Sequence, residues 1–195
     1  MRRLALVSAL FVLAASPAMA QISDLERQRL VAHLEMTASW LLDEVANLSE
    51  TQTSFKRSAG TWSILEVVEH LVVVGPIYWD DLQRSVQGQP IGRSLASGDA
   101  TILWYGIDRT HREPALASES ATGQLRSLRA GLDDYRKHHA RLLQYAKTTK
   151  DDLRDRFVAR QGCDAYQWAL LISTHEQRHI LQIREIKADP AFPAK

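Results

Sequence analysis

The stretch DAYQWALLISTHEQRHILQIREIK, residues 164–187, decides the fold of this chain. Its large apolar residues recur at steps of three and four, as at Trp168, Ile172, Ile183 and Ile186. That spacing places them on one face of an α-helix. The stretch therefore predicts a long helix whose apolar seam faces a core.

Two histidines interrupt this seam, at His175 and His179. Residues four apart lie on the same side of a helix, so both imidazoles point the same way, at a spacing that can clamp one metal ion. Buried imidazoles need partners for their ring nitrogens, and a shared metal would supply one. The alternative is two core histidines, each bonded to a neighbouring side chain.

The same periodicity predicts three further helices, over about residues 23–49, 63–86 and 122–148. Ser23 and Ser63 are each followed three residues later by a glutamate, the pattern of a capping box at a helix start. No segment shows the alternating pattern of a strand. We therefore predict an all-α fold, a four-helix bundle.

The second and third of these helices are separated by a long segment, residues 87–123, without sustained periodicity. One short helix is expected near residues 99–107. Connectors of this length are uncommon in compact domains, so the segment is either a crossover between distant ends of the bundle or a lid. Trp104 and Tyr105 are the candidate lid residues.

The first twenty residues have the pattern of a secretory signal peptide. Arg2 and Arg3 precede an apolar run, and Ala18-Met19-Ala20 forms a small-x-small cleavage site. We expect cleavage after Ala20, a periplasmic or secreted protein, and a single domain over residues 21–195. The only cysteine, Cys163, cannot form an intrachain disulfide and is expected to be half-buried.

Charge is balanced over the whole chain, with 24 Lys and Arg against 23 Asp and Glu. A near-neutral, dispersed charge lacks the basic footprint of a nucleic-acid-binding protein. No second apolar stretch is long enough to cross a membrane. These features predict no nucleic-acid partner and no membrane association after signal cleavage.

A third histidine, His70, lies on the predicted helix 63–86, on a largely apolar surface. Metal sites in helix bundles are built from side chains on facing helices. Together, His70, His175 and His179 form a candidate three-histidine metal site.

The sequence His175-Glu176-Gln177-Arg178-His179 also matches the HExxH helix of zinc proteases, in which Glu176 would be the general base. The extended form of that motif requires Gly and His where this chain has Gln182 and Glu185. Few residues remain after His179 to supply a downstream ligand. We therefore expect Glu176 to face away from the seam, as a solvated side chain or a partner of a metal ligand.

His139 occupies a seam position on the predicted helix 122–148. It could be a fourth ligand, a partner of a ligand or a proton carrier, although a half-buried bundle histidine is the simpler interpretation. Tyr135 is expected in the core and Arg136 in solvent. The remaining histidines are expected at the surface: His33, His111 and His138.

The chain resembles the DinB-like family in two motifs, Trp62-Ser63-Ile64-x-Glu66-x-x-x-His70-Leu71 and His175-Glu176-x-x-His179-Ile180-x-Gln182. The resemblance implies a bundle with a long crossover between its second and third helices. It implies a divalent metal, most often zinc or nickel, held by His70, His175 and His179. Better understood members are transferases and isomerases that use small thiols such as mycothiol or bacillithiol.

These observations favour an exported metal-dependent enzyme, of hydrolase or thiol-dependent transferase type, that acts on a small molecule. A non-catalytic, metal-binding or stress-related bundle is the alternative, and a homodimer is compatible with either. A hydrolase with Glu66 or Glu69 as base is a further alternative, although the capping position of Glu66 explains that residue without catalysis.

Overall fold

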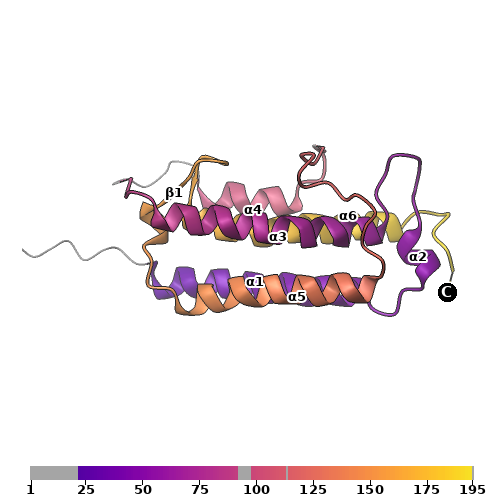
Figure 1. The fold of residues 1–195 in the computed structure, drawn as a ribbon, viewed down its shortest axis with the longest axis horizontal. Helices are drawn as coiled ribbons and strands as arrows, with labels where there is room; N and C mark the ends of the chain where they lie inside the picture. The colour runs from indigo at the N-terminus through magenta and orange to yellow at the C-terminus, as the bar shows by residue number, and fades with distance from the viewer. Residues whose placement is uncertain (1–21, 92–97, 113, 195) are drawn as a thin grey trace, which may run out of the picture.

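The computed structural model describes residues 22–91, 98–112 and 114–194. The predicted signal peptide lies outside these residues. Four long helices build the molecule: α1 (Asp24–Val45), α3 (Ile64–Gln87), α5 (Leu128–Thr148) and α6 (Ala165–Lys187). Each of α1 and α3 packs against both α5 and α6, so the four surround one core (Figure 1). The predicted all-α four-helix bundle is confirmed.

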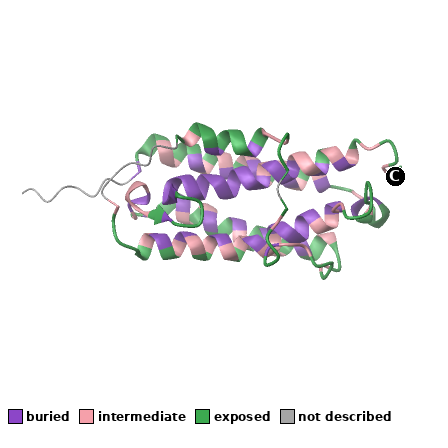
Figure 2. Cartoon of the chain, turned by 90° about the horizontal axis from the view of Figure 1, so that it is seen from above, coloured by how far each residue is buried: buried purple, intermediate pink, exposed green. Residues whose placement is uncertain are grey.

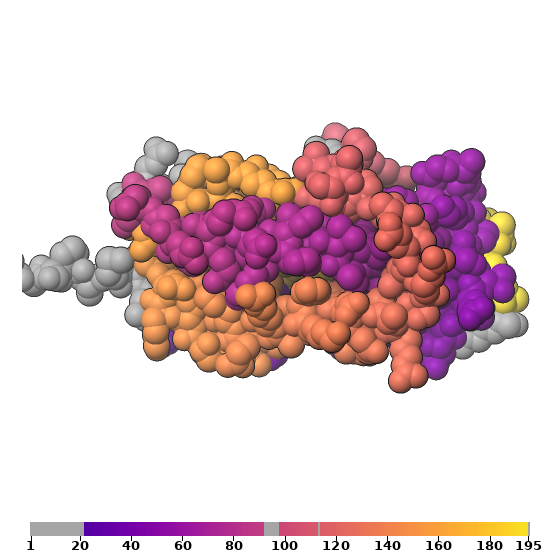
Figure 3. Space-filling view, in the orientation of Figure 1, coloured from indigo at the N-terminus to yellow at the C-terminus, as the bar shows by residue number. Residues whose placement is uncertain are grey.

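The order of the helices explains the long connector. Figure 1 shows that α3 and α5 run in the same direction, opposite to α1 and α6. The chain must therefore return along the full length of the bundle between α3 and α5. Helix α4 (Asp99–Ile107) makes part of that return while packed on α6. The following segment crosses the N-terminal end of α3 to reach α5 (Figure 3).

Several short elements complete the described fold. Helix α2 (Glu50–Ser54) follows α1, and a 3-10 turn, η1 (Leu153–Asp155), leads to a two-residue antiparallel ladder of β1 (Phe157–Val158) with β2 (Cys163–Asp164). The sequence analysis expected one helix over 23–49 and no strand. Both differences are local, because Ser49 caps a new helix and Gly162 adopts a positive φ of 65° in the turn between the strands. The expectation for Cys163 was also wrong, since this residue is only 2% exposed.

Capping boxes set the starts of three long helices, two of them at the predicted Ser23 and Ser63. The side chain of Ser23 accepts from the N–H of Glu26, and the carboxylate of Glu26 accepts from the N–H of Ser23. Ser63 with Glu66 forms the same reciprocal pair at α3. Asp164 with Gln167 forms it at α6. Each box satisfies two backbone donors that the helix itself leaves without partners.

Helix α5 begins six residues later than the predicted start at residue 122. The buried carboxylate of Glu69 on α3 accepts the backbone N–H groups of Thr122, Gly123 and Gln124, at 3.0 to 3.1 Å. Gly123 also has a positive φ of 74°. The segment is thus bound to α3 in a non-helical conformation, and this contact between distant residues is invisible to local periodicity.

Helix α6 is the most buried of the long helices, and buried residues gather along the middle of the bundle (Figure 2). Trp168 is fully buried and its indole N–H donates to the backbone carbonyl of Tyr78, at 2.9 Å. This bond holds α3 and α6 in a fixed register next to the histidines. Within the described residues, no helix is long and apolar enough to cross a membrane.

Helix α4 approaches α6 closely because it carries Gly106 at the contact. A Cβ at this position would come within 2.9 Å of the backbone carbonyl oxygen of Thr174. The absence of a side chain therefore lets α4, with Tyr105, lie directly beside the histidine-bearing face of α6.

Candidate metal centre

The structure brings His70, His175 and His179 together at the buried interface of α3 and α6. The Nε2 atom of His175 lies 3.2 Å from Nε2 of His70 and 3.1 Å from Nε2 of His179. Metal–nitrogen bonds of about 2.0–2.1 Å at tetrahedral or octahedral angles place ligand nitrogens roughly 3 Å apart. The cluster therefore has the dimensions of a three-imidazole metal site. Among the described residues, these three histidines are the group whose side-chain atoms lie close enough together to hold a metal ion.

The outer nitrogens of two rings fix the tautomers. Nδ1 of His70 donates to the backbone carbonyl of Glu119, at 2.6 Å, and Nδ1 of His179 donates to the side-chain oxygen of Gln182, at 2.9 Å. Each neutral ring then presents a lone pair on Nε2. His175 can donate a proton to only one of these two atoms, so hydrogen bonding cannot satisfy the cluster. A divalent cation at the centre would satisfy all three nitrogens.

Burial keeps the three imidazoles neutral. It lowers the pKa of His70 to about 4, and, together with the charges of His70, Arg178 and Arg160, it lowers the pKa of His175 to about 3. Burial, followed by the charges of its two histidine neighbours, also holds the pKa of His179 well below 6.5. Neutral imidazole is the form that binds metal.

These shifts predict an acid-labile metal-free protein. In the unfolded chain the three histidines take up protons near pH 6.5, whereas in the folded chain burial holds all three pKa values well below 6.5 and keeps the imidazoles neutral. Below pH 6.5 the unfolded state therefore binds more protons, and the free energy of unfolding falls by up to about 1.4 kcal/mol per pH unit for each histidine. His139, which contacts Glu176, has a raised pKa, so its own contribution to the free energy of unfolding changes with pH in the opposite direction.

Urea unfolding of the metal-free protein between about pH 7 and pH 5 measures this effect. The variant His179→Asn should show a shallower dependence on pH. An unfolding free energy that does not change over this range would contradict the assignment of three neutral buried histidines.

A cleft of about 830 Å³ opens beside the cluster. The three histidines form part of its wall, with residues of the crossover, α3 and α6. Trp62 packs over two of the rings, with ring centroids 5.0 Å from His70 and 6.3 Å from His179. Of the predicted lid residues, Tyr105 lines the cleft, whereas Trp104 is 62% exposed.

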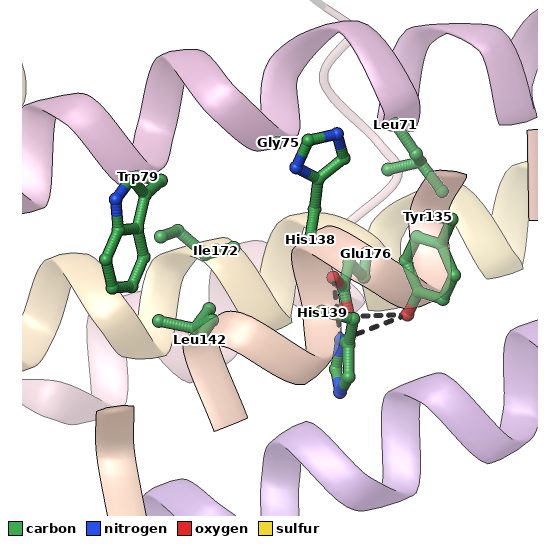
Figure 4. A pocket seen from close by; sticks show the side chains of 9 residues that line it. All are labelled: Leu71, Gly75, Trp79, Tyr135, His138, His139, Leu142, Ile172 and Glu176. Carbon is green, nitrogen blue, oxygen red and sulfur yellow. Dashed lines mark hydrogen bonds and ion pairs between the residues drawn. The ribbon is translucent and has the colours of Figure 1, made fainter. Parts of the chain in front are cut away.

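Glu176 faces α1 and α5 rather than the cluster, and the expectation of a solvated side chain or a partner of a metal ligand was wrong. Its carboxylate is buried and accepts a hydrogen bond from Thr37 at 3.0 Å. It also accepts one from Tyr135 at 3.1 Å, and Nδ1 of His139 lies 3.3 Å from it (Figure 4). These partners belong to α1 and α5. Glu176 is therefore a hydrogen-bonded residue of the core, and none of its hydrogen bonds involves a nitrogen of the metal site.

His139 is buried in the same network, and no metal-ligand group of the described residues includes it. Burial lowers its pKa, but the charge of Glu176 and their hydrogen bond outweigh burial and raise it. Tyr135 is core, and Arg136 is exposed, as expected. Of the three histidines expected at the surface, only His111 is exposed. The expectation was wrong for His33, which is bonded to Ser173, and for His138, which packs over Gly75, because both are partly buried.

Neither alternative base reaches the cluster in this structure. Glu66 completes the capping box of α3 and pairs with Lys56 at 2.7 Å. Glu69 binds the backbone before α5. Neither residue lines the cleft.

The sequence analysis missed several residues around the histidines, which come from the crossover and from the β1–β2 turn. Glu119 and Arg160 lie far from both motifs in the chain, yet Glu119 binds His70 and Arg160 pairs with Glu119. Arg178 could have been noticed, because it lies three residues after His175 and therefore near the same helix face. It donates to the backbone carbonyls of Tyr105, Asp108 and His111 and so anchors the crossover to α6.

Fold and site together define a class: helical bundles with a three-histidine cluster between the second and fourth long helices. The chain belongs to the DinB superfamily, whose family model matches residues 26–183. The fold is similar to that of YfiT from Bacillus subtilis, described as "a probable metal-dependent hydrolase with an unusual four-helix bundle topology". The TM-score is 0.58 at 17% identity, over 86% of this chain and 89% of YfiT. No curated protein sequence matches the chain.

Proposed function

We propose that this protein is an exported, metal-dependent enzyme of hydrolytic type that acts on a small molecule. His70, His175 and His179 would hold one divalent metal, zinc or nickel. The observation that carries the proposal is the convergence of three imidazoles next to an open cleft: Nε2 of His175 lies 3.2 Å from that of His70 and 3.1 Å from that of His179, and all three ligand atoms lie within 4.8 Å of one another. The description of YfiT as a metal-dependent hydrolase supports the same reaction class.

The donor set favours a catalytic over a structural metal. Structural zinc sites have four protein ligands, whereas catalytic sites have three and leave a position for water or substrate. No fourth His, Cys, Asp or Glu joins the cluster among the described residues. When bound, the metal would supply Lewis-acid activation of water or of a substrate oxygen.

The chain's own residues would orient this site. Glu119 and Gln182 hold the rings of His70 and His179 through their Nδ1 atoms, and Trp62 packs over both rings. Such partners of metal ligands commonly account for about 10–100-fold in metal affinity or activity. Arg178 keeps the crossover against α6 and thus keeps the cleft in shape.

The alternatives differ in what supports them. A thiol-dependent transferase would use the same three histidines, and it is supported by the family resemblance alone. A zinc protease of the HExxH type is disfavoured, because Glu176 is bonded to α1 and α5 rather than directed at the cleft. A non-catalytic metal-binding bundle is disfavoured by the open cleft.

The test uses the full chain expressed with its first twenty residues, so that metal loading follows export. We expect an exported protein that begins at Gln21 and carries about one zinc or nickel ion per chain. Hydrolysis of a panel of small amides and esters should stop on chelation and return with the metal. A metal-free exported protein, or activity that resists complete chelation, would overturn the proposal.

A further inference from the structure

The cleft beside the histidine cluster carries more positive than negative side chains. Its described lining residues include five arginines and three carboxylates: Arg57, Arg109, Arg112, Arg160 and Arg178 against Asp108, Glu119 and Glu185. The three histidines add no negative charge, and a divalent metal would add two positive charges. An excess of one sign of charge along a cleft favours ligands of the opposite sign.

Three of the arginines gather around Glu185, beyond the histidines on α6. Arg109 donates to both carboxylate oxygens, to Oε1 at 3.1 Å and to Oε2 at 3.3 Å. Arg112 also donates to Oε2, at 3.1 Å, and Arg57 lies 4.0 Å from the same oxygen. Arg57 also pairs with Asp189 at 3.1 Å. Three guanidinium groups thus share two carboxylates, so one positive charge at this end of the cleft has no partner of its own in the described chain.

Arg112 is the most accessible of the three, with 65% of its side chain exposed. A guanidinium has five N–H donors, and within the described chain Arg112 uses one, toward Glu185. Its remaining donors can bind a carboxylate or phosphate oxygen of a ligand.

The position of this arginine group sets the length of the ligand. Glu185 follows His179 by six residues on α6, which corresponds to about 9 Å along the helix axis. The walls that line the same cleft include apolar side chains, among them Trp62, Leu116 and Ile186.

We infer that the cleft binds a small organic substrate whose anionic end contacts Arg109 and Arg112 and whose reacting group lies at the histidine cluster. The placement of the reacting group rests on the proposed function, whereas the placement of the anionic end rests on the arginines alone. The substrate class is an amphipathic acid, with an apolar middle and a terminal carboxylate or phosphate.

Binding of simple probes tests the anionic end directly. The probes are 3-phenylpropionate, its neutral amide and phenyl phosphate, titrated at millimolar concentration into the metal-loaded protein and followed by NMR. We expect the acid to bind at least about tenfold more tightly than the amide. The phosphate probe shows which of the two anions the arginines prefer.

Two matched variants locate the effect. Arg112→Gln removes one charge from the cleft and should weaken binding of the acid about fivefold, without changing the affinity for the amide. Arg136→Gln removes an exposed arginine of α5, outside the cleft, and should change neither affinity. The metal content of Arg112→Gln should equal that of the wild type.

The outcomes separate this inference from the proposed function. Equal binding of acid and amide, or an acid affinity that Arg112→Gln leaves unchanged, would overturn the inference even if the metal is present. A wild-type protein without metal would overturn the proposed function, while an Arg112-dependent preference for the acid would still support the inference. The metal-free variant His175→Ala should keep that preference if the arginines, rather than the metal, bind the anion.

Discussion

Replacing His175 with alanine should abolish metal binding. Its Nε2 atom lies within 3.2 Å of the Nε2 atoms of both other histidines, so it is the shared member of the cluster. Loss of a residue that merely supports a ligand costs about 10–100-fold in metal affinity, and loss of one of three ligands should cost more. Elemental analysis of the purified variant should fall from about one metal per chain to a trace.

The control for this result is His138→Ala. His138 is a partly buried histidine on α5 that packs over Gly75 and does not belong to the cluster. This variant should keep its metal. Full metal retention in His175→Ala would show that the ligands have been wrongly identified.

Replacing Glu176 with alanine should destabilise the fold without removing the metal. The change leaves the buried Thr37, Tyr135 and His139 without their shared acceptor. Breaking a buried charged pair typically costs about 3–5 kcal/mol. Urea unfolding of the metal-loaded protein measures the loss, and elemental analysis of the folded fraction should still find about one metal per chain.

A zinc protease of the HExxH type would give the opposite result. There Glu176→Ala would remove the general base, with little effect on stability. The control is Glu35→Ala, which removes an exposed carboxylate paired with Lys147 and should cost less than about 1 kcal/mol. An unchanged unfolding free energy in Glu176→Ala would contradict the buried network.

The network around Glu176 also explains why the motif alone misleads. His175, Glu176 and His179 lie within about one helical turn, so the motif by itself is compatible with a carboxylate beside the histidines. In the structure the carboxylate of Glu176 instead bonds to α1 and α5. Only the positions of those helices show that the carboxylate is buried and bonded rather than solvated.

Local sequence determined the helices of this protein. Capping boxes at Ser23, Ser63 and Asp164 set the starts of α1, α3 and α6, and periodic apolar seams set the buried faces of the long helices. Both effects depend on residues within a few positions of each other. The short helix Asp99–Ile107 was predicted with the bounds that the structure gives. The two histidine motifs identified His70, His175 and His179 because each motif is also a local pattern, in which the key residues lie on one face of one helix.

Tertiary structure alone decided how these parts meet. The late start of α5 depends on Glu69, more than fifty residues earlier in the chain, and the ring of His70 is oriented by the carbonyl of Glu119. The arginines of the cleft come from separate segments of the chain, which share no sequence motif. Such contacts join residues distant in sequence, and no local pattern records them; the sequence therefore specified the helices and the three histidines, whereas packing specified the cleft and its charge.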